Sequence, residues 1–83
     1  MCTQSRVALI GIVVYESESV PKLNEYLHEC AGYIIGRMGI PYPKKGVSLI
    51  SVAVDAPNQA ISALTGKLGN IEGINVKTAY SKA

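Results

Sequence analysis

The segment from Val7 to Tyr15 reads V-A-L-I-G-I-V-V-Y and contains no charged side chain. Successive side chains of a β-strand point to opposite faces, so a strand with one face in water alternates apolar and polar residues. This segment is apolar in both phases, and it is therefore predicted to be a central strand with both faces covered. One face carries Val7, Leu9, Val13 and Tyr15, and the other carries Ala8, Ile10, Ile12 and Val14.

A chain of 83 residues can place one layer of helices over one face of a small sheet, but it can hardly cover both faces. The expected cover for the second face is another copy of the chain. Charged residues make up only 17% of the sequence, below the roughly 25% of average soluble domains. We therefore predict a closed homo-oligomer, either a dimer or a tetramer.

A first helix is predicted over residues 20–31, because apolar residues recur there at spacings of three, four and three. The stripe consists of Val20, Leu23, Leu27 and Cys30. Ser17 or Ser19 can cap this helix at its start. Gly32 is a natural end for it.

A second helix is predicted after a buried strand over 47–54, with Asp55 as its cap and Pro57 in its first turn. Its apolar stripe consists of Ile61, Leu64, Leu68 and Ile71. Gly66 and Gly69 are expected to permit close packing of this helix against its neighbours.

Two more strands complete the pattern. One begins near Tyr33 and is expected to end at Pro41 and Pro43, which cannot donate to a ladder. The other, over 74–80, alternates apolar and polar residues, so we place it at a sheet edge. The order βαββαβ predicts an α+β ferredoxin-like sandwich, a four-stranded antiparallel sheet with two helices on one face. Residues 1–83 are read as a single domain.

Several function classes lack the residues that they need. The chain has no C-x-x-C for metal carriage, no aromatic residue on the third strand for base stacking, and a single histidine outside any catalytic motif. The net charge of +2 does not indicate nucleic acid. We therefore expect a protein that is not an enzyme, holds no cofactor and does not bind nucleic acid directly.

The polar residues that remain suggest two kinds of site. Arg37 interrupts an apolar strand, and its guanidinium suits an anion or carboxylate clamp, although pairing with Glu16 or Glu72 would also explain it. Together with the loop that follows the first strand, it gives the candidate ligand-binding residues. These are Tyr15, Ser17, Ser19 and Arg37.

His28 and Cys30 are the alternative site. Residues two apart on a helix point in roughly opposite directions, so one chain cannot place both on one metal ion. A metal site shared across an oligomer interface stays open, beside the simpler interpretation that Cys30 is a small buried apolar residue.

The two cysteines, Cys2 and Cys30, show no disulfide-type spacing, which indicates a reduced, cytoplasmic protein. The apolar run at Val7 is too short to cross a membrane as a helix, and no small-residue cleavage site follows it. We therefore expect a mature strand there and no membrane association.

The stretches Y-I-I-G-R-M-G-I-P-Y-P (33–43) and I-S-A-L-T-G-K-L-G-N-I-E-G-I-N-V-K-T (61–78) resemble the small iron-only hydrogenase system regulators. The resemblance implies a fold similar to ACT domains and to the C-terminal domain of the nickel-responsive repressor, which sense ligands at subunit interfaces. The repressor's nickel site uses several histidines and does not carry over to a chain with one.

The resemblance implies a ligand-sensing regulatory module, linked to transcription, that works as a homo-oligomer with the ligand at its subunit interfaces. A small molecule and a protein partner are the partners that this interpretation allows. Two alternatives stay open, a structural or adaptor subunit without a ligand, and a metal sensor that uses His28 and Cys30 across an interface.

Overall fold

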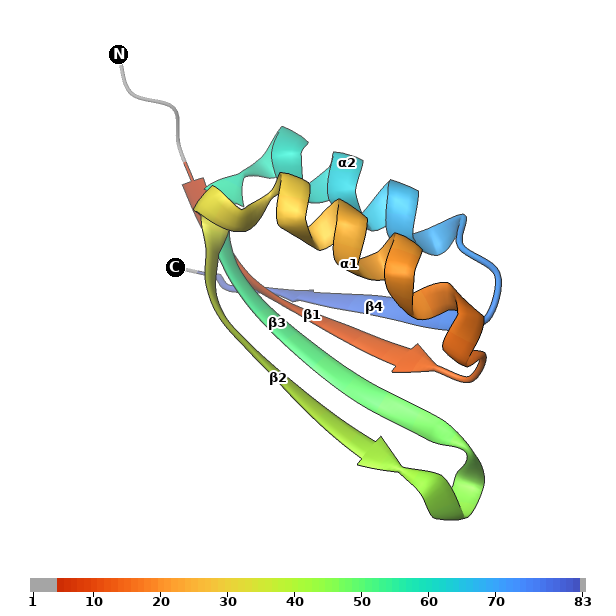
Figure 1. Ribbon diagram of the computed structural model, residues 1–83. Coiled ribbons are helices and arrows are strands. Elements are labelled where there is room, and N and C mark those ends of the chain that lie inside the picture. Colours follow the sequence, from red (N-terminus) through yellow and green to blue (C-terminus); the bar gives the residue numbers. More distant parts are fainter. Residues whose placement is uncertain (1–4, 83) are drawn as a thin grey trace.

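The computed structural model describes residues 5–82, where strands and helices follow one another in the order βαββαβ (Figure 1). The strands are β1 (Ser5–Val14), β2 (Ile34–Tyr42), β3 (Val47–Pro57) and β4 (Ile74–Tyr80). The helices are α1 (Val20–Glu29) and α2 (Asn58–Gly69). Short 3-10 turns lie at Ser17–Ser19, Ala31–Tyr33 and Pro43–Lys45. The predicted ferredoxin-like fold is confirmed. Cys2 lies outside the described residues.

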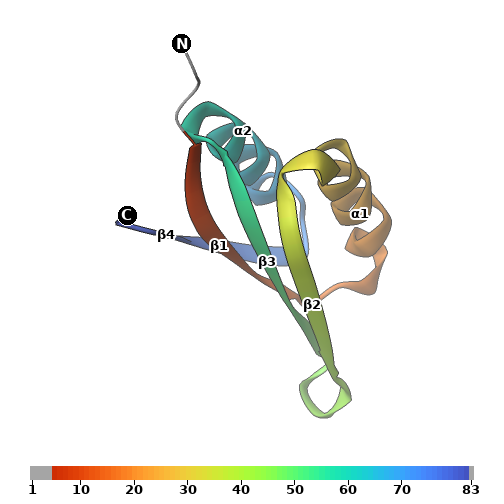
Figure 2. The ribbon, with the colours of Figure 1, turned by 90° about the vertical axis from the view of Figure 1, so that its left-hand side faces the viewer.

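The four strands form one antiparallel sheet in the order β2-β3-β1-β4, with β4 at an edge as predicted. Both helices lie on the same face of this sheet (Figures 1 and 2), which we call the helix face. No helix or strand of residues 5–82 covers the opposite face, and we call it the open face. Alternate side chains of β1 lie on opposite faces of the sheet, as expected. Ile10 is fully buried on the helix face, and Leu9 is 50% exposed on the open face.

The core lies between the sheet and the helices. The predicted stripes supply its helical half, with Leu23 and Leu27 from α1 and Ile61, Leu64 and Leu68 from α2, all buried. The helices are therefore held by packing of their apolar stripes rather than by end caps, because neither α1 nor α2 has a side-chain cap hydrogen bond. No helix within residues 5–82 is long and apolar enough to cross a membrane.

The start of α2 differs from the prediction. Asp55 does not cap the helix, because β3 continues to Pro57 and Asp55 pairs with Val7 of β1. Pro57 itself is the N-cap residue. The ladder with β1 thus keeps the chain extended for three residues beyond the predicted strand end at residue 54.

The expected strand end is confirmed, and one expectation about glycines is wrong. β2 ends at Tyr42, directly before Pro43, and Pro41 still lies within it because one side of an edge strand's backbone is unpaired. Gly66 and Gly69 do not serve close packing, since both are exposed and a Cβ added at either would meet no atom within 4 Å.

The hairpin of β2 and β3 extends beyond the rest of the sheet (Figure 2). Pairing between β1 and β3 stops at Val14 and Ser48, whereas pairing between β2 and β3 continues to Tyr42 and Val47. The turn at its tip ends at Gly46, whose φ of 67° is the left-handed conformation that glycine adopts most readily.

The loop after β1 is tied to the turn before β4. The backbone N–H groups of Tyr15 and Glu16 donate to the carbonyl oxygen of Gly73, at 2.8 and 3.2 Å. The buried Ser19 hydroxyl donates to the carbonyl oxygen of Glu72. We call this set of contacts the loop junction. It fixes where α1 begins relative to the sheet.

Gly73 is the residue of the loop junction that least tolerates a side chain. Its φ is +90°, and a Cβ there would lie 2.5 Å from the Ser19 Oγ and 2.6 Å from the Glu16 Cβ. We expect Gly73→Ala to lower the free energy of unfolding by about 2 kcal/mol or more. Urea unfolding at one fixed protein concentration measures this.

Gly66→Ala is the matched control, because it adds the same methyl group at an open position of α2. We expect it to stabilise the protein by up to about 1 kcal/mol through helix propensity. Equal effects of the two substitutions would contradict the role given to the loop junction.

Candidate functional site

The open face is the most unusual surface of the described chain. Antiparallel sheets with one solvated face normally present polar side chains there. Here large apolar side chains are 44–59% exposed on it, and they come from three neighbouring strands. They are Val7, Leu9, Met38, Ile40, Tyr42 and Leu49. Burying one such side chain fully is worth about 1.5–3 kcal/mol, so this face gains much from a cover.

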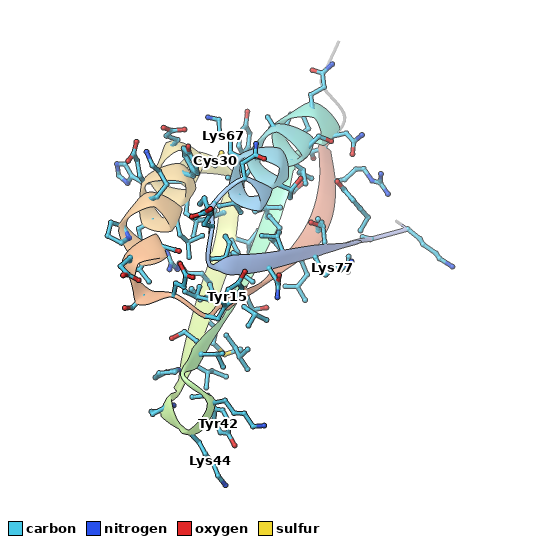
Figure 3. The ribbon with its side chains drawn as sticks, turned by 90° about the vertical axis from the view of Figure 1, so that its right-hand side faces the viewer. Tyr15, Cys30, Tyr42, Lys44, Lys67 and Lys77 are labelled. Atoms are coloured by element: carbon cyan, nitrogen blue, oxygen red, sulfur yellow. The ribbon has the colours of Figure 1, made fainter. Side chains whose placement is uncertain are left out.

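A hollow of about 350 Å3 lies in the middle of the open face. Val13, Ile40 and Leu49 line one side of it. Asn75 and Lys77 of the edge strand β4 make the other side polar. Figure 3 shows Lys77 on the side of β4 away from the helices. The hollow thus combines an apolar wall with one cation and one amide, the chemistry of a small-molecule or side-chain pocket.

The four predicted ligand residues lie in different places on a single chain. Tyr15 is 50% exposed just after β1, and Ser17 lines a hollow of about 230 Å3 between the start of α1 and the β2–β3 tip. Ser19 lies beside another hollow, of about 400 Å3, and its hydroxyl already belongs to the loop junction. One chain therefore brings the three loop residues close in sequence but does not join them in one pocket with Arg37.

Arg37 lies on the helix side of β2. Its register partner is the buried Val52, and its guanidinium donates to the Asn24 Oδ1 of α1 at 3.2 Å. Among residues 5–82 it forms no ion pair with Glu16 or Glu72, so that pairing is wrong. The guanidinium is exposed at the rim of a hollow of about 500 Å3, where it can still receive an anion.

His28 and Cys30 lie at the end of α1. His28 is exposed, and Cys30 is a half-buried free thiol that packs against the core. Within the described residues no group of three histidine, cysteine or acidic side chains comes together. A metal ion on His28 would therefore need further ligands from elsewhere.

A small cluster of charges joins the two helices on the outer surface. The Lys67 Nζ donates to the Glu29 Oε1 at 3.0 Å, and it also lies 5.4 Å from the centre of the Tyr26 ring. The hydrogen bond and the charge of Glu29 raise the pKa of Lys67 above its ordinary value of 10.5. Because the folded-state pKa of Lys67 is raised, the contribution of the Lys67–Glu29 pair to the free energy of unfolding is fully present at neutral pH. It is lost only as the pH rises through the folded-state pKa. The Lys67 and Glu29 side chains are both about half exposed, so water screens the pair and it adds little stability.

The hollow on the open face was not predicted from the sequence. Its floor is made by Gly11 and Ser51, which are directly opposite each other on the two central strands. The available signal was Gly11 itself, because a glycine inside a strand often marks a close approach of another group. The sequence indicated for Lys77 only that it is one of the polar residues that alternate with apolar residues along an edge strand.

The comparisons with known proteins identify the family. Residues 6–78 match the TM1266-like family model, described as "Iron-only hydrogenase system regulator, putative", and the chain belongs to this family. The solved structure of the uncharacterized protein TM1266 from Thermotoga maritima is 34% identical, with a TM-score of 0.91. That similarity covers 95% of this chain and 100% of the other. No functionally curated protein matches the chain.

A more distant structure shows how widely the fold is used. A formyltetrahydrofolate deformylase from Pseudomonas putida KT2440 matches with a TM-score of 0.67 at 12% identity. The match covers 93% of this chain but 29% of the deformylase, so the chain corresponds to less than a third of that enzyme. At this identity the match supports the fold and carries no functional residue.

Ser19 and Ser17 allow the loop junction to be tested at the candidate ligand loop. Ser19→Ala removes the buried hydroxyl that donates to the Glu72 carbonyl, and we expect it to lower the free energy of unfolding by about 1 kcal/mol. Ser17→Ala is the matched control on an exposed residue of the same loop, with an expected change within about 0.5 kcal/mol. Thermal and urea unfolding measure both. Equal stability of the two variants would show that the Ser19 hydroxyl does not hold the loop.

Proposed function

We propose that this chain is a single-domain, non-enzymatic regulatory module of an iron-only hydrogenase system, which works as a homo-oligomer and senses a small ligand at its subunit interfaces. The family description supports the regulatory role. The free thiol of Cys30 is compatible with the reducing cytoplasm, where we place the protein. A link to transcription would run through a protein partner.

The observation that carries this proposal is the apolar open face with its hollow. A surface of this composition favours contact with another macromolecule over exposure to water. When copies of the chain associate, pockets that are shallow on one copy become deeper between two. The ligand would then select one arrangement of the copies, because a ligand shifts an equilibrium by its difference in affinity for two states.

The candidate ligand contacts are Tyr15, Ser17 and Arg37, which are exposed and retain hydrogen-bonding capacity. The Arg37 guanidinium favours a carboxylate or phosphate group on the ligand. Ser19 would act by positioning the loop, since its hydroxyl is engaged with Glu72. Residues on separate parts of one chain can share a ligand when a second copy closes the gap between them.

The adaptor and metal-sensor alternatives make different predictions for the purified protein. Native mass spectrometry, with no chelator used in purification, reports the subunit number and any retained mass together. We expect a dimer or tetramer that carries an organic ligand. A retained metal ion that is lost in His28→Ala would favour the metal sensor. A stable monomer would contradict the proposal.

A thermal-shift screen with small carboxylate and phosphate metabolites extends this test to ligands that are lost in purification. We expect at least one of them to raise the melting temperature, and Arg37→Ala to weaken its binding by about 10-fold or more, the effect of losing one charge-assisted contact. Arg6→Ala is the matched control. Arg6 lies at the start of the central strand β1, with its guanidinium 4.5 Å from the centre of the Tyr80 ring, and it does not line the hollow beside Arg37. No shift with any compound, in an oligomer with no retained mass, would favour the adaptor.

A further inference from the structure

Neither the backbone conformation of Gly11 nor its packing within residues 5–82 requires a glycine at this position. It lies in the middle of the central strand β1, in regular register with Ser51 on one side and Lys77 on the other. Among the described glycines a positive φ occurs only at Gly46 and Gly73, so the conformation of Gly11 suits any residue. A Cβ added at Gly11 would meet the Lys77 carbonyl oxygen at 3.7 Å, an ordinary contact.

This glycine weakens a strand that is otherwise built of β-branched and apolar residues, because glycine loses the most conformational freedom on folding and contributes no packing. What it creates is the floor of the hollow. Across the sheet the same row reads Met38, Ser51, Gly11 and Lys77. Two small residues in the centre thus lie between a flexible apolar side chain and a cation.

We infer that a second copy of this chain packs its open face against this one, and that an apolar side chain of each copy enters the other's hollow over Gly11. This inference rests on the homo-oligomer of the proposed function and specifies its interface. A hollow of about 350 Å3 has room for a large side chain, since an engineered cavity of about 150 Å3 already admits a benzene molecule.

The size of the open face favours a second copy over a small ligand. Four strands about 4.8 Å apart and eight residues that rise about 3.3 Å each give a face of roughly 500 Å2 in projection, before side-chain relief is added. This is the scale of the roughly 800 Å2 that each partner contributes to a stable interface. A small molecule in the hollow would leave Val7, Leu9 and Tyr42 in water, whereas a second sheet would cover them.

The charges of the face are compatible with self-pairing. The open face carries Lys77 on the edge strand β4 and Asp55 at the end of the β3–β1 pairing. Both are exposed near its margins, so the apolar centre can be buried while both charges keep their water. A two-fold pairing uses the same surface on each copy, and such a surface must supply both the projecting side chain and the hollow.

The edge of β2 is less suited to this contact than the face. The edge strand β2 contains an irregularity between Ile34 and Gly36 and a proline at position 41, and both interrupt a regular hydrogen-bonding edge. The apolar row of β2, which includes Met38 and Ile40, points into the open face. Sheet-to-sheet packing about 10 Å apart therefore uses the apolar surface that edge pairing would leave exposed.

Size-exclusion chromatography with light scattering over a 100-fold range of concentration tests the inference on the full chain. We expect wild-type protein to be a dimer or larger. Leu49→Glu places a charge beside the hollow and should weaken association by about 100-fold or more, since an unpaired buried charge is strongly unfavourable. Ser62→Glu, on the exposed side of α2, is the matched charge control and should associate like wild type.

Gly11→Leu tests the hollow itself. If a side chain of the partner enters it, the added leucine fills the same space, and association should fall by about 10-fold or more although the face becomes more apolar. If the hollow is empty in the oligomer, association should stay equal or become stronger, which would overturn the inference. Gly66→Ala is the control for a glycine outside the face, and circular dichroism confirms that each variant is folded.

The remaining outcomes separate this inference from the proposed function. An oligomer that persists in Leu49→Glu uses another interface, which overturns the inference and leaves the sensor proposal standing. A monomeric wild-type protein overturns the inference together with the homo-oligomer. A folded, dissociated Leu49→Glu in a protein that binds no metabolite supports the interface and favours an adaptor.

Discussion

The central strand β1 is apolar on both faces, and residues 5–82 cover only one of them. Its helix face, with Ile10 and Ile12 almost fully buried, holds both helices and fixes the layered arrangement. Its open face has the same chemical character but meets no element of the chain among residues 5–82. The core and the candidate interface are therefore two sides of one strand. A substitution pattern that made the open face polar would leave the core intact, because the two sets of side chains do not share a face.

Much of the fold could be predicted because the signals are local. The apolar run of β1, the alternation in β4 and the stripes at Leu23 and Leu64 depend on residues only a few positions apart, and such patterns survive into the structure. The wrong predictions involve partners that are distant in sequence. Asp55 indicated a helix cap, but the ladder with Val7 keeps it extended. Arg37 indicated a carboxylate partner, but its guanidinium donates to the amide oxygen of Asn24.

The candidate site was less predictable than the fold for the same reason. Gly11, Ser51 and Lys77 come from three segments, and only the register of the sheet brings them into one row. The loop junction is equally non-local, since Ser19 and Glu72 are 53 residues apart. A glycine within a strand and a glycine before one, Gly73, are visible in the sequence. Gly11 forms the floor of a hollow and Gly73 permits a tight turn. These roles depend on neighbours that are distant in sequence, so they could not be predicted from the local pattern.

The loop junction and the open face are connected through β1, and this connection would give the proposed ligand a physical route to the proposed assembly. Tyr15 follows directly on β1, and its backbone N–H is held by Gly73 immediately before β4. A ligand that contacts Tyr15 or Ser17 therefore acts on a loop anchored to two adjacent strands of the open face. Such a ligand alters association only if it binds the paired and unpaired copies with different affinity. A loop at the margin of the proposed interface would meet that condition, because pairing would change its surroundings while the junction keeps its backbone in place.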